Sequence, residues 1–139
     1  MAVTPLKAQI LTRLNTDATL IALLSGGANG VYPRAAADPG QATATPFVRL
    51  HMENETPTSE ITAKQLFSVY VYDDPTTGWG YWVIDSILAS VRKLLDGYES
   101  FTFDGRAWGR CEYNGAGPEE SDEGWQKLMK WARFSIARV

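Results

Sequence analysis

Apolar residues recur with a helical period at the start of the chain. Thr4 and Pro5 resemble a helix start, because the hydroxyl can cap the first turn and proline lacks only an N–H that this turn does not use. The apolar residues that follow share one helical face: Leu6, Ile10 and Leu14. Asp17 can cap a second short helix of the segment "ATLIALL", which the glycines of "SGGANG" end. The pattern predicts an N-terminal pair of helices.

The period changes to two at Phe47. In "FVRLHMENE", Val48, Leu50 and Met52 face one side, and the polar residues Arg49, His51 and Glu53 face the other. Residues 54–60 resemble a turn, and "ITAKQLFSVYVYD" then alternates as a second strand. The sequence therefore predicts an antiparallel hairpin.

The hairpin register follows from the apolar positions. Odd-numbered residues of the first strand must lie opposite even-numbered residues of the second, because a slip of one residue would turn one strand over. This register places Lys64 on the same polar face as His51 and Glu53. A Glu53–Lys64 cross-strand pair is the expected result.

Beyond the hairpin the pattern predicts one long helix and further strands. Residues 79–95 carry a wide apolar stripe, and Gly97 is a natural stop. The segments "YESFTF" and "RAWGRCEY" are typical of strands, separated by "DG", and "NGAGPEESDEG" is expected to be a loop. The chain end fits either a helix or a strand, and we predict a strand from about Lys127 onward.

These elements predict an α+β fold. A mainly antiparallel sheet of four to five strands would carry the long helix and the short N-terminal helical pair on it. The length of 139 residues suits one domain over 1–139, and 45% hydrophobic residues can supply its core. The stretch 33–46, rich in Pro, Ala, Gly and Thr, is expected to be a long surface loop and a candidate contact element.

Charge and cysteine content narrow the environment. A net charge of -3 without a basic cluster disfavours DNA binding, although DNA could still pass nearby. The single Cys111 cannot close an intrachain disulfide and suits a reducing compartment. The N-terminus has no signal-peptide pattern, and no apolar run approaches membrane-spanning length, so we expect a soluble protein that is intracellular at synthesis and has no membrane partner.

The only histidine raises the question of a metal or acid/base site. His51 is followed by Glu53 and Glu55 at steps of two, but the ends of this set start roughly 13 Å apart along a strand. A third metal ligand would have to come from another element, and Lys64 would compete for the carboxylate. A solvated strand face is the favoured interpretation.

Other candidate chemistry is weaker still. "SGGANG" lacks the Lys and Ser/Thr of a phosphate-binding loop, and "EESDE" at 119–123 lacks EF-hand spacing, although a weak cation site there stays open. No nucleophile stands in a known motif, and the tryptophan-rich "GWGYW" favours core packing or a protein interface. We therefore assign no catalytic, cofactor-binding or metal-binding residue, and expect no cofactor.

The order of these segments resembles the small tail completion, or tail terminator, proteins of long-tailed bacteriophages. The resemblance lies in "ILTRLNTDATLIALLSGGANGVYP", "TPFVRL" and "AKQLFSVYVYDD" before a long helix that ends in "LLDG", and in the closing strand "ARFSIARV". It covers nearly the whole chain. The segment "PEESDE" and the tryptophan-rich final part do not match the pattern.

The resemblance implies a non-enzymatic virion protein at the head-proximal end of the tail, assembled in the host cytoplasm. Such a protein forms a ring, expected to be hexameric, which caps the tail tube, stops its polymerisation and offers a surface for head-tail joining. The implied partners are further copies of itself, the tail tube protein and a head-completion or neck protein, with DNA passing through the lumen without specific binding.

Two elements are expected to project toward these partners. The candidate contact residues are Arg34 and Asp38 in the long loop, and Glu53, Glu55, Glu60 and Lys64 on the hairpin. A head-completion or connector protein of the neck is the nearest alternative. A small α+β enzyme or ligand-binding module using His51 is the remaining one, and it would require a closed pocket around that histidine.

Overall fold

The computed structural model describes the chain in eight stretches. They are residues 6–25, 27–32, 46–57, 63–74, 81–103, 106–107, 109–122 and 127–138. Side chains at a few of these positions, including 54–57, are not described. The expected loop at 33–46 lies outside the described residues except for Pro46.

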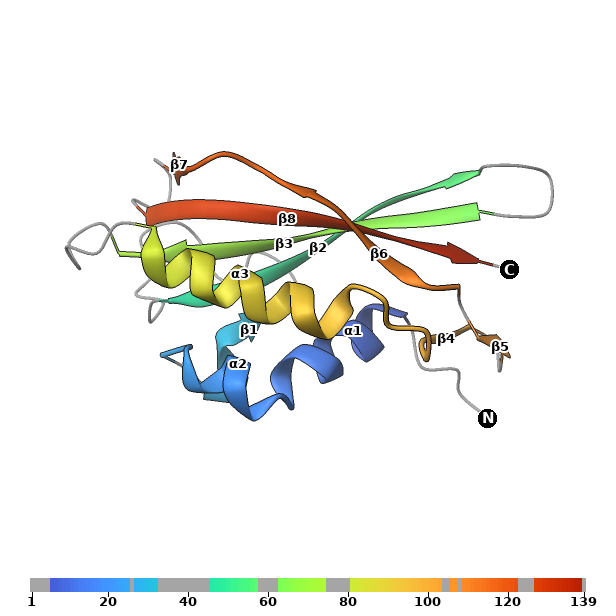
Figure 1. Ribbon diagram of the computed structural model, residues 1–139, viewed down its shortest axis with the longest axis horizontal. Coiled ribbons are helices and arrows are strands. Elements are labelled where there is room, and N and C mark those ends of the chain that lie inside the picture. The colour runs from blue at the N-terminus through green and yellow to red at the C-terminus, as the bar shows by residue number, and fades with distance from the viewer. Residues whose placement is uncertain are drawn as a thin grey trace.

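A mixed sheet forms one layer of the molecule (Figure 1). Its strands are β1 (Val31–Tyr32), β2 (Phe47–Pro57), β3 (Ala63–Asp73), β6 (Cys111–Ala116), β7 (Glu120–Asp122) and β8 (Lys127–Arg138). The order is β1-β2-β3-β8-β6, and β7 also pairs with β8, beside its first residues. The predicted α+β class is confirmed, and the sheet has six strands where four to five were expected. The β1–β2 pair is parallel and all other pairs are antiparallel.

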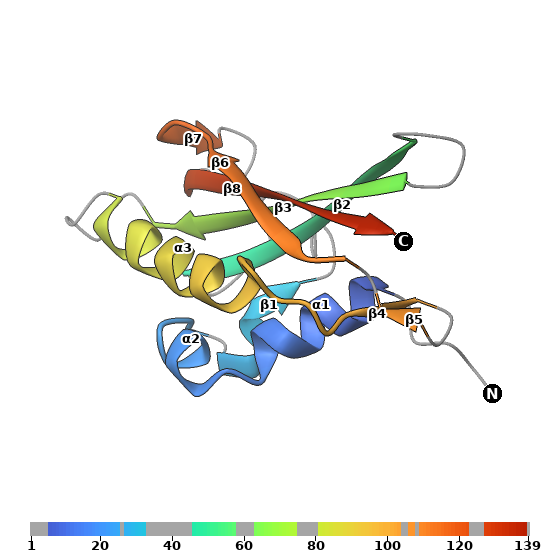
Figure 2. The same cartoon turned by 45° about the vertical axis from the view of Figure 1, so that its right-hand side comes forward.

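The helices lie on one side of this sheet (Figures 1 and 2). They are α1 (Leu6–Asn15), α2 (Ala18–Ala22), the short 3-10 helix η1 (Gly27–Gly30) and α3 (Trp82–Leu95). Helix α3 contacts β3 and β8, while α1 contacts α3 and β1. The expected Asp17 cap is confirmed, because its carboxylate accepts a hydrogen bond from the Leu20 N–H at 2.9 Å.

The long helix begins slightly later than the apolar stripe indicated. Tyr81 is the N-cap residue, and residues 79 and 80 lie outside the described part of the chain. The predicted stop is confirmed: Gly97 has φ +86°, a left-handed backbone conformation that glycine adopts without steric cost.

The core fills the space between the helices and the sheet. Phe67 of β3 and Phe134 of β8 are Cα partners whose rings stack at 5.4 Å, and both are 0% exposed. Around them lie buried aliphatic residues from every layer: Ile10, Leu14, Leu20, Val48, Leu50, Val69, Val71, Ile84, Ile87, Val91, Leu95 and Ile136. Burial of this apolar surface is the main force that holds α3 on the sheet.

The predicted parity of the hairpin, odd-numbered residues opposite even-numbered ones, is confirmed up to Met52. His51 pairs with Ser68 and Met52 with Phe67, so odd-numbered residues lie opposite even-numbered ones. Beyond Met52 a bulge places two residues of β2 opposite the single Leu66, and Glu55 then pairs with Gln65. Lys64 shares the face of Ser68 on β3, as expected, because the alternation of β3 is unbroken.

The end of the chain differs in one respect from the prediction. The strand from Lys127 is confirmed as β8, and "YESFTF" and "RAWGRCEY" contain β4 (Thr102–Phe103), β5 (Arg106–Ala107) and the start of β6. The expected loop "NGAGPEESDEG" is wrong in part, since β6 continues to Ala116 and β7 pairs with β8. A strand at a sheet edge needs no apolar alternation, so this acidic segment carries no strand signal.

Candidate functional site

The sheet has a second face that no described helix covers (Figure 1). Strand alternation places the polar residues of β2 on this open face, together with the even-numbered residues of β3 and the odd-numbered residues of β8. Its described residues are Phe47, Arg49, His51, Glu53, Lys64, Leu66, Ser68, Tyr70, Tyr72, Met129, Trp131, Arg133, Ser135 and Ala137. Four of them are nonetheless buried: Phe47, Ser68, Tyr72 and Ser135. This open face is the candidate functional surface.

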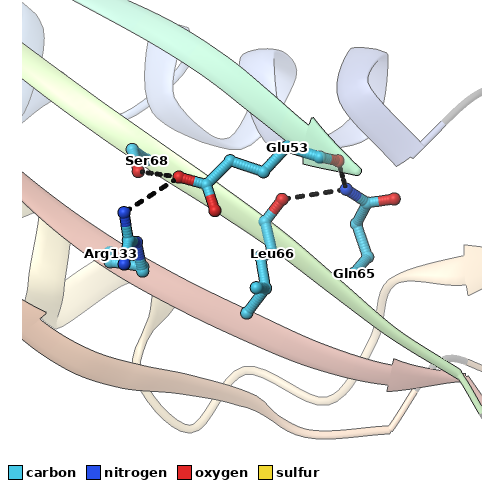
Figure 3. A network of polar contacts seen from close by, with 5 residues as sticks. All are labelled: Glu53, Gln65, Leu66, Ser68 and Arg133. Atoms are coloured by element: carbon cyan, nitrogen blue, oxygen red, sulfur yellow. Dashed lines mark hydrogen bonds and ion pairs between the residues drawn. The ribbon is translucent and has the colours of Figure 1, made fainter. Parts of the chain in front are cut away.

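A polar network spans three strands of the open face where the hairpin leaves the body (Figure 3). The Glu53 carboxylate accepts a hydrogen bond from the Ser68 hydroxyl at 3.0 Å and pairs with the Arg133 guanidinium at 3.2 Å. The Gln65 amide donates to the Glu53 carbonyl and, at 2.8 Å, to the Leu66 carbonyl. The side chain of Gln65 thereby satisfies a backbone carbonyl that the bulge removes from the ladder.

The expected Glu53–Lys64 pair is wrong, because the observed register places Glu53 at the bulge opposite Leu66 rather than opposite Lys64. Lys64 lies opposite Thr56 and is exposed, whereas Glu53 reaches across β3 to Arg133 on β8. Ser68 and Arg133 are Cα partners, so the two groups that hold the carboxylate stand side by side. With 45% of the Arg133 side chain exposed, the ion pair is expected to contribute about 0.2–1 kcal/mol.

Arginine side chains lie flat on aromatic rings across the same face. The Arg49 guanidinium carbon is 4.4 Å from the centre of the Tyr70 ring and 5.9 Å from that of Tyr72. Arg133 lies over Trp131 at 5.2 Å. Tyr70 and Trp131 are Cα partners, so the rings continue from strand to strand. Tyrosine, tryptophan and arginine are the residues most enriched at the energetic centres of protein interfaces.

His51 does not form a catalytic or metal cluster with its neighbours in the described structure. The ring is exposed and meets Tyr70 edge-on, with 6.3 Å between ring centres. Glu53 is engaged by Ser68 and Arg133. Among the described residues, no group of three or more His, Cys, Asp and Glu side chains could hold a metal ion.

Two buried titratable groups lie away from the open face. Cys111 is 0% exposed, and burial, followed by the nearby carboxylates of Asp96 and Glu112, raises the pKa of its thiol to about 12. Asp73, at the end of β3, is 2% exposed, and burial raises the pKa of its carboxyl. A thiol that stays protonated is a poor nucleophile, so Cys111 acts as a core residue.

A cavity of about 550 Å³ lies between α1 and the chain after α3. Its polar groups already bind one another. Gln9 donates to the Thr102 carbonyl at 2.7 Å and accepts from the Thr102 N–H at 2.8 Å. The Arg13 Nε donates to the Leu94 carbonyl at 2.6 Å, and its guanidinium lies 3.5 Å from the centre of the Tyr98 ring. The groups that line this cavity therefore connect α1 to α3 and to the chain after it.

The predicted contact residues divide into three groups. Arg34, Asp38 and Glu60 lie outside the described residues. The backbone of Glu55 lies in β2, but its side chain is not described. Glu53 and Lys64 are on the open face, and Glu53 alone belongs to the network there.

Sequence reasoning missed three partners in the network: Gln65, Ser68 and Arg133. Alternation along β3 and β8 places Ser68 and Arg133 on the polar side of their strands, so this signal was available. Their meeting with Glu53 depends on the order β2-β3-β8, which is a long-range pairing.

No helix in the described part of the chain combines the length and the apolar character that crossing a membrane requires.

Comparisons with known proteins show a shared fold. No protein-family model matches the chain, and no curated protein matches it. Among solved structures, a chain from the virion of a native gene transfer agent particle is similar, with a TM-score of 0.66 and 17% sequence identity. The similarity covers 96% of this chain and 94% of that chain. The two proteins therefore share one fold over nearly their full lengths.

Proposed function

We propose that this protein is a structural component of a phage-like virion, in which it caps the tail tube as a ring, ends tube polymerisation and presents the surface that joins tail to head. The observation that carries the proposal is the shared fold with a chain of a gene transfer agent virion, which leaves almost no part of either chain unmatched. The order of motifs along the sequence supports the tail terminator role within that class.

The side chains support a role in assembly over a role in catalysis. The exposed His51 has no carboxylate partner among its described contacts, and Cys111 is buried with a raised pKa. The large cavity is lined by groups that already bind one another. A non-enzymatic protein that acts through its surfaces fits these observations.

A ring requires two different complementary surfaces on each subunit, because head-to-tail contacts are heterologous. We assign one of them to the projecting hairpin of β2 and β3. The Glu53–Ser68–Arg133 network braces its base, so the hairpin leaves the body in a defined direction (Figure 3). Glu53, Glu55, Glu60 and Lys64 are its proposed contact residues, and Arg34 and Asp38 belong to the second proposed contact element.

The decisive experiment is solution mass combined with electron microscopy of the purified protein, alone and with tail tubes of its phage. Rings of about six subunits at tube ends, and shorter tubes when the protein is present during polymerisation, are the expected result. A strict monomer that leaves tube ends bare and tube lengths unchanged would contradict the proposal. Rings that bind heads but never tubes would assign the protein to the neck instead.

The hairpin assignment has its own test. Reversing charge at Glu53, Glu55 and Glu60 to lysine is expected to weaken ring formation and tube capping. Glu99→Lys, at an exposed position in the segment after α3, is the control and should leave both unchanged. Unchanged rings from the triple variant, with native circular dichroism, would contradict the role of the hairpin while leaving the ring itself in place.

A further inference from the structure

Arg49 has no carboxylate partner among the residues that the structure describes. It makes no hydrogen bond or ion pair with any described residue, and its Nε is buried without a hydrogen-bond partner. Three other arginines of the described structure have polar partners: Arg13 binds the Leu94 carbonyl, Arg92 the Asp96 carboxylate, and Arg133 the Glu53 carboxylate. A partly buried cation without an anion is costly in the isolated chain, and an incoming carboxylate would remove that cost.

The aromatic rings next to Arg49 restrict the position of its guanidinium group. Its guanidinium lies between two tyrosines of β3, at 4.4 Å from the Tyr70 ring centre and 5.9 Å from the Tyr72 ring centre. The Phe47 ring stacks on Tyr72 at 4.8 Å, which fixes the position of that ring in turn. A planar guanidinium held in one orientation loses little further entropy when it binds a carboxylate with two hydrogen bonds.

A carboxylate that could bind Arg49 lies near β7, at the edge of the sheet away from β1 and β2. Glu119, between β6 and β7, is exposed and makes no ion pair with a described residue. Pro118 beside it is also exposed, and Glu120 is half-buried with its carbonyl accepting a hydrogen bond from the Tyr81 hydroxyl at 2.8 Å. This hydrogen bond anchors the acidic turn, defined as residues 118–120, to the start of α3.

Arg49 and the acidic turn cannot readily meet within one chain. β2 and β7 are separated by β3 and β8, so three strand spacings of about 4.8 Å place them about 14 Å apart at the backbone. Figures 1 and 2 both show β7 and the β1–β2 edge on opposite sides of the sheet. Two complementary surfaces at opposite edges of one subunit are what a head-to-tail ring requires.

We propose that the Arg49 guanidinium on its tyrosines receives the Glu119 carboxylate of the neighbouring copy in the ring. The inference rests on the proposed ring and names one pair of side chains that would meet across the contact between neighbouring subunits. A carboxylate of the same protein is favoured over a nucleic acid phosphate, because the chain has a net charge of -3 and no cluster of basic residues in its sequence.

The test uses charge exchange between two single variants. Arg49→Glu alone places like charges at every contact of a homogeneous ring, and so does Glu119→Lys alone. Each is expected to weaken self-association about tenfold or more in sedimentation velocity. In an equimolar mixture of the two, strictly alternating rings contain only opposite charges at these contacts. The mixture is therefore expected to regain ring formation, with equal numbers of both variants in native mass spectra.

Control variants distinguish a loss of folding from a loss of the contact between subunits. Lys93→Glu, on the exposed side of α3, carries the same charge change as Arg49→Glu and should not affect rings. If Arg49→Glu fails to fold, Arg49→Gln replaces it, and its effect should be reduced when Glu119→Lys is already present. Thermal unfolding followed by circular dichroism identifies variants that fold.

Three results would overturn the inference. The first is that Glu119→Lys forms rings as well as the wild type. The second is that the equimolar mixture forms no rings although both variants fold. The third is salt-dependent binding of a mixed-sequence DNA duplex that Arg49→Gln abolishes and Glu119→Lys leaves unchanged, which would assign Arg49 to phosphate. If wild type forms no ring, the proposed function fails instead, and this contact fails with it.

Discussion

The two faces of β3 and β8 differ in what they contribute to the molecule. Toward the helices, Phe67 and Phe134 stack with no exposed surface. The next pair of Cα partners, Leu66 before Phe67 and Ser135 after Phe134, faces the open side. Alternation thus separates two surfaces that share one backbone.

The difference indicates which surface holds the fold and which is available for function. Burial of apolar surface on the helix side stabilises the fold, and this contribution is not directional, so it depends little on which apolar residues are in contact. The open side holds Glu53, Ser68, Arg133 and the arginine–tyrosine stack, whose polar contacts give geometry but little net stability. Substitutions on the helix side should therefore destabilise the protein most, whereas those of exposed residues on the open side should change assembly and spare the fold.

The largest expected effect is on the helix side. Phe134→Ala removes one ring of the central stack and leaves a cavity, which should lower the free energy of unfolding by about 3–5 kcal/mol. Leu66→Ala, half-buried on the open face, is the matched truncation and should cost about 1–2 kcal/mol. Urea denaturation measures both. Equal losses would break the distinction between the faces.

The rim of the open face should respond to added volume. A Cβ at Gly117 would fall inside contact distance of the Trp131 indole, and the Gly117 N–H donates to the Trp131 carbonyl at 2.8 Å. Gly117→Ala must therefore displace the ring or the strand, at a cost of about 1–3 kcal/mol. Ala116→Ser, exposed at the preceding position, should stay within about 0.5 kcal/mol of wild type. Thermal unfolding and tryptophan fluorescence measure both variants. An unfolding temperature of Gly117→Ala equal to that of the wild type would show that the Trp131 indole can move aside at no cost.

Local signals in the sequence predicted most of the helix side. The Asp17 cap, the Gly97 stop and the odd-to-even parity of the hairpin each depend on residues near one another in the chain, and all three are confirmed. The bulge after Met52 was missed, because its two unpaired residues are polar and break no apolar alternation. The strand β7 was missed for a similar reason, since its acidic sequence is typical of a loop.

The partners across the open face could not be predicted in the same way. The Glu53–Arg133 pair joins β2 to β8 across β3, and sequence reasoning considered only the hairpin partner Lys64. Such a pair becomes visible only when strand order is known. The sequence therefore predicted which residues face the open side but not which of them meet.

The stability of the protein at alkaline pH tests whether water reaches the helix side of the sheet. The thiol of Cys111 has its pKa raised by burial from 9.0 to about 12. Between these values the unfolded chain loses the proton and the folded chain keeps it, so the unfolded state binds fewer protons and stability falls as pH rises. The slope attributable to Cys111 is about -1.4 kcal/mol per pH unit above pH 9, and it is absent below.

Cys111→Ala is the reference for this measurement, because other groups also titrate above pH 9. The difference in free energy of unfolding between wild type and this variant, followed by urea denaturation from pH 8 to pH 10.5, isolates the thiol. The native thiol should also resist alkylation at pH 8 until the protein unfolds. A flat difference together with rapid native alkylation would show that water reaches this side of the sheet.

The smallest expected effect on stability gives the sharpest comparison. Glu53→Gln keeps the size of the side chain and removes the charge that meets Arg133, so it should cost at most about 1 kcal/mol. Asp85→Asn is the comparison on the helix side, because Asp85 pairs with Lys130 at 2.6 Å, with 50% of its side chain exposed against 22% for Glu53. The two variants should unfold within about 0.5 kcal/mol of each other, but only Glu53→Gln should weaken ring formation in sedimentation velocity, since it loosens the base of the hairpin. Equal assembly by both variants would mean that the network orders the open face without directing any contact.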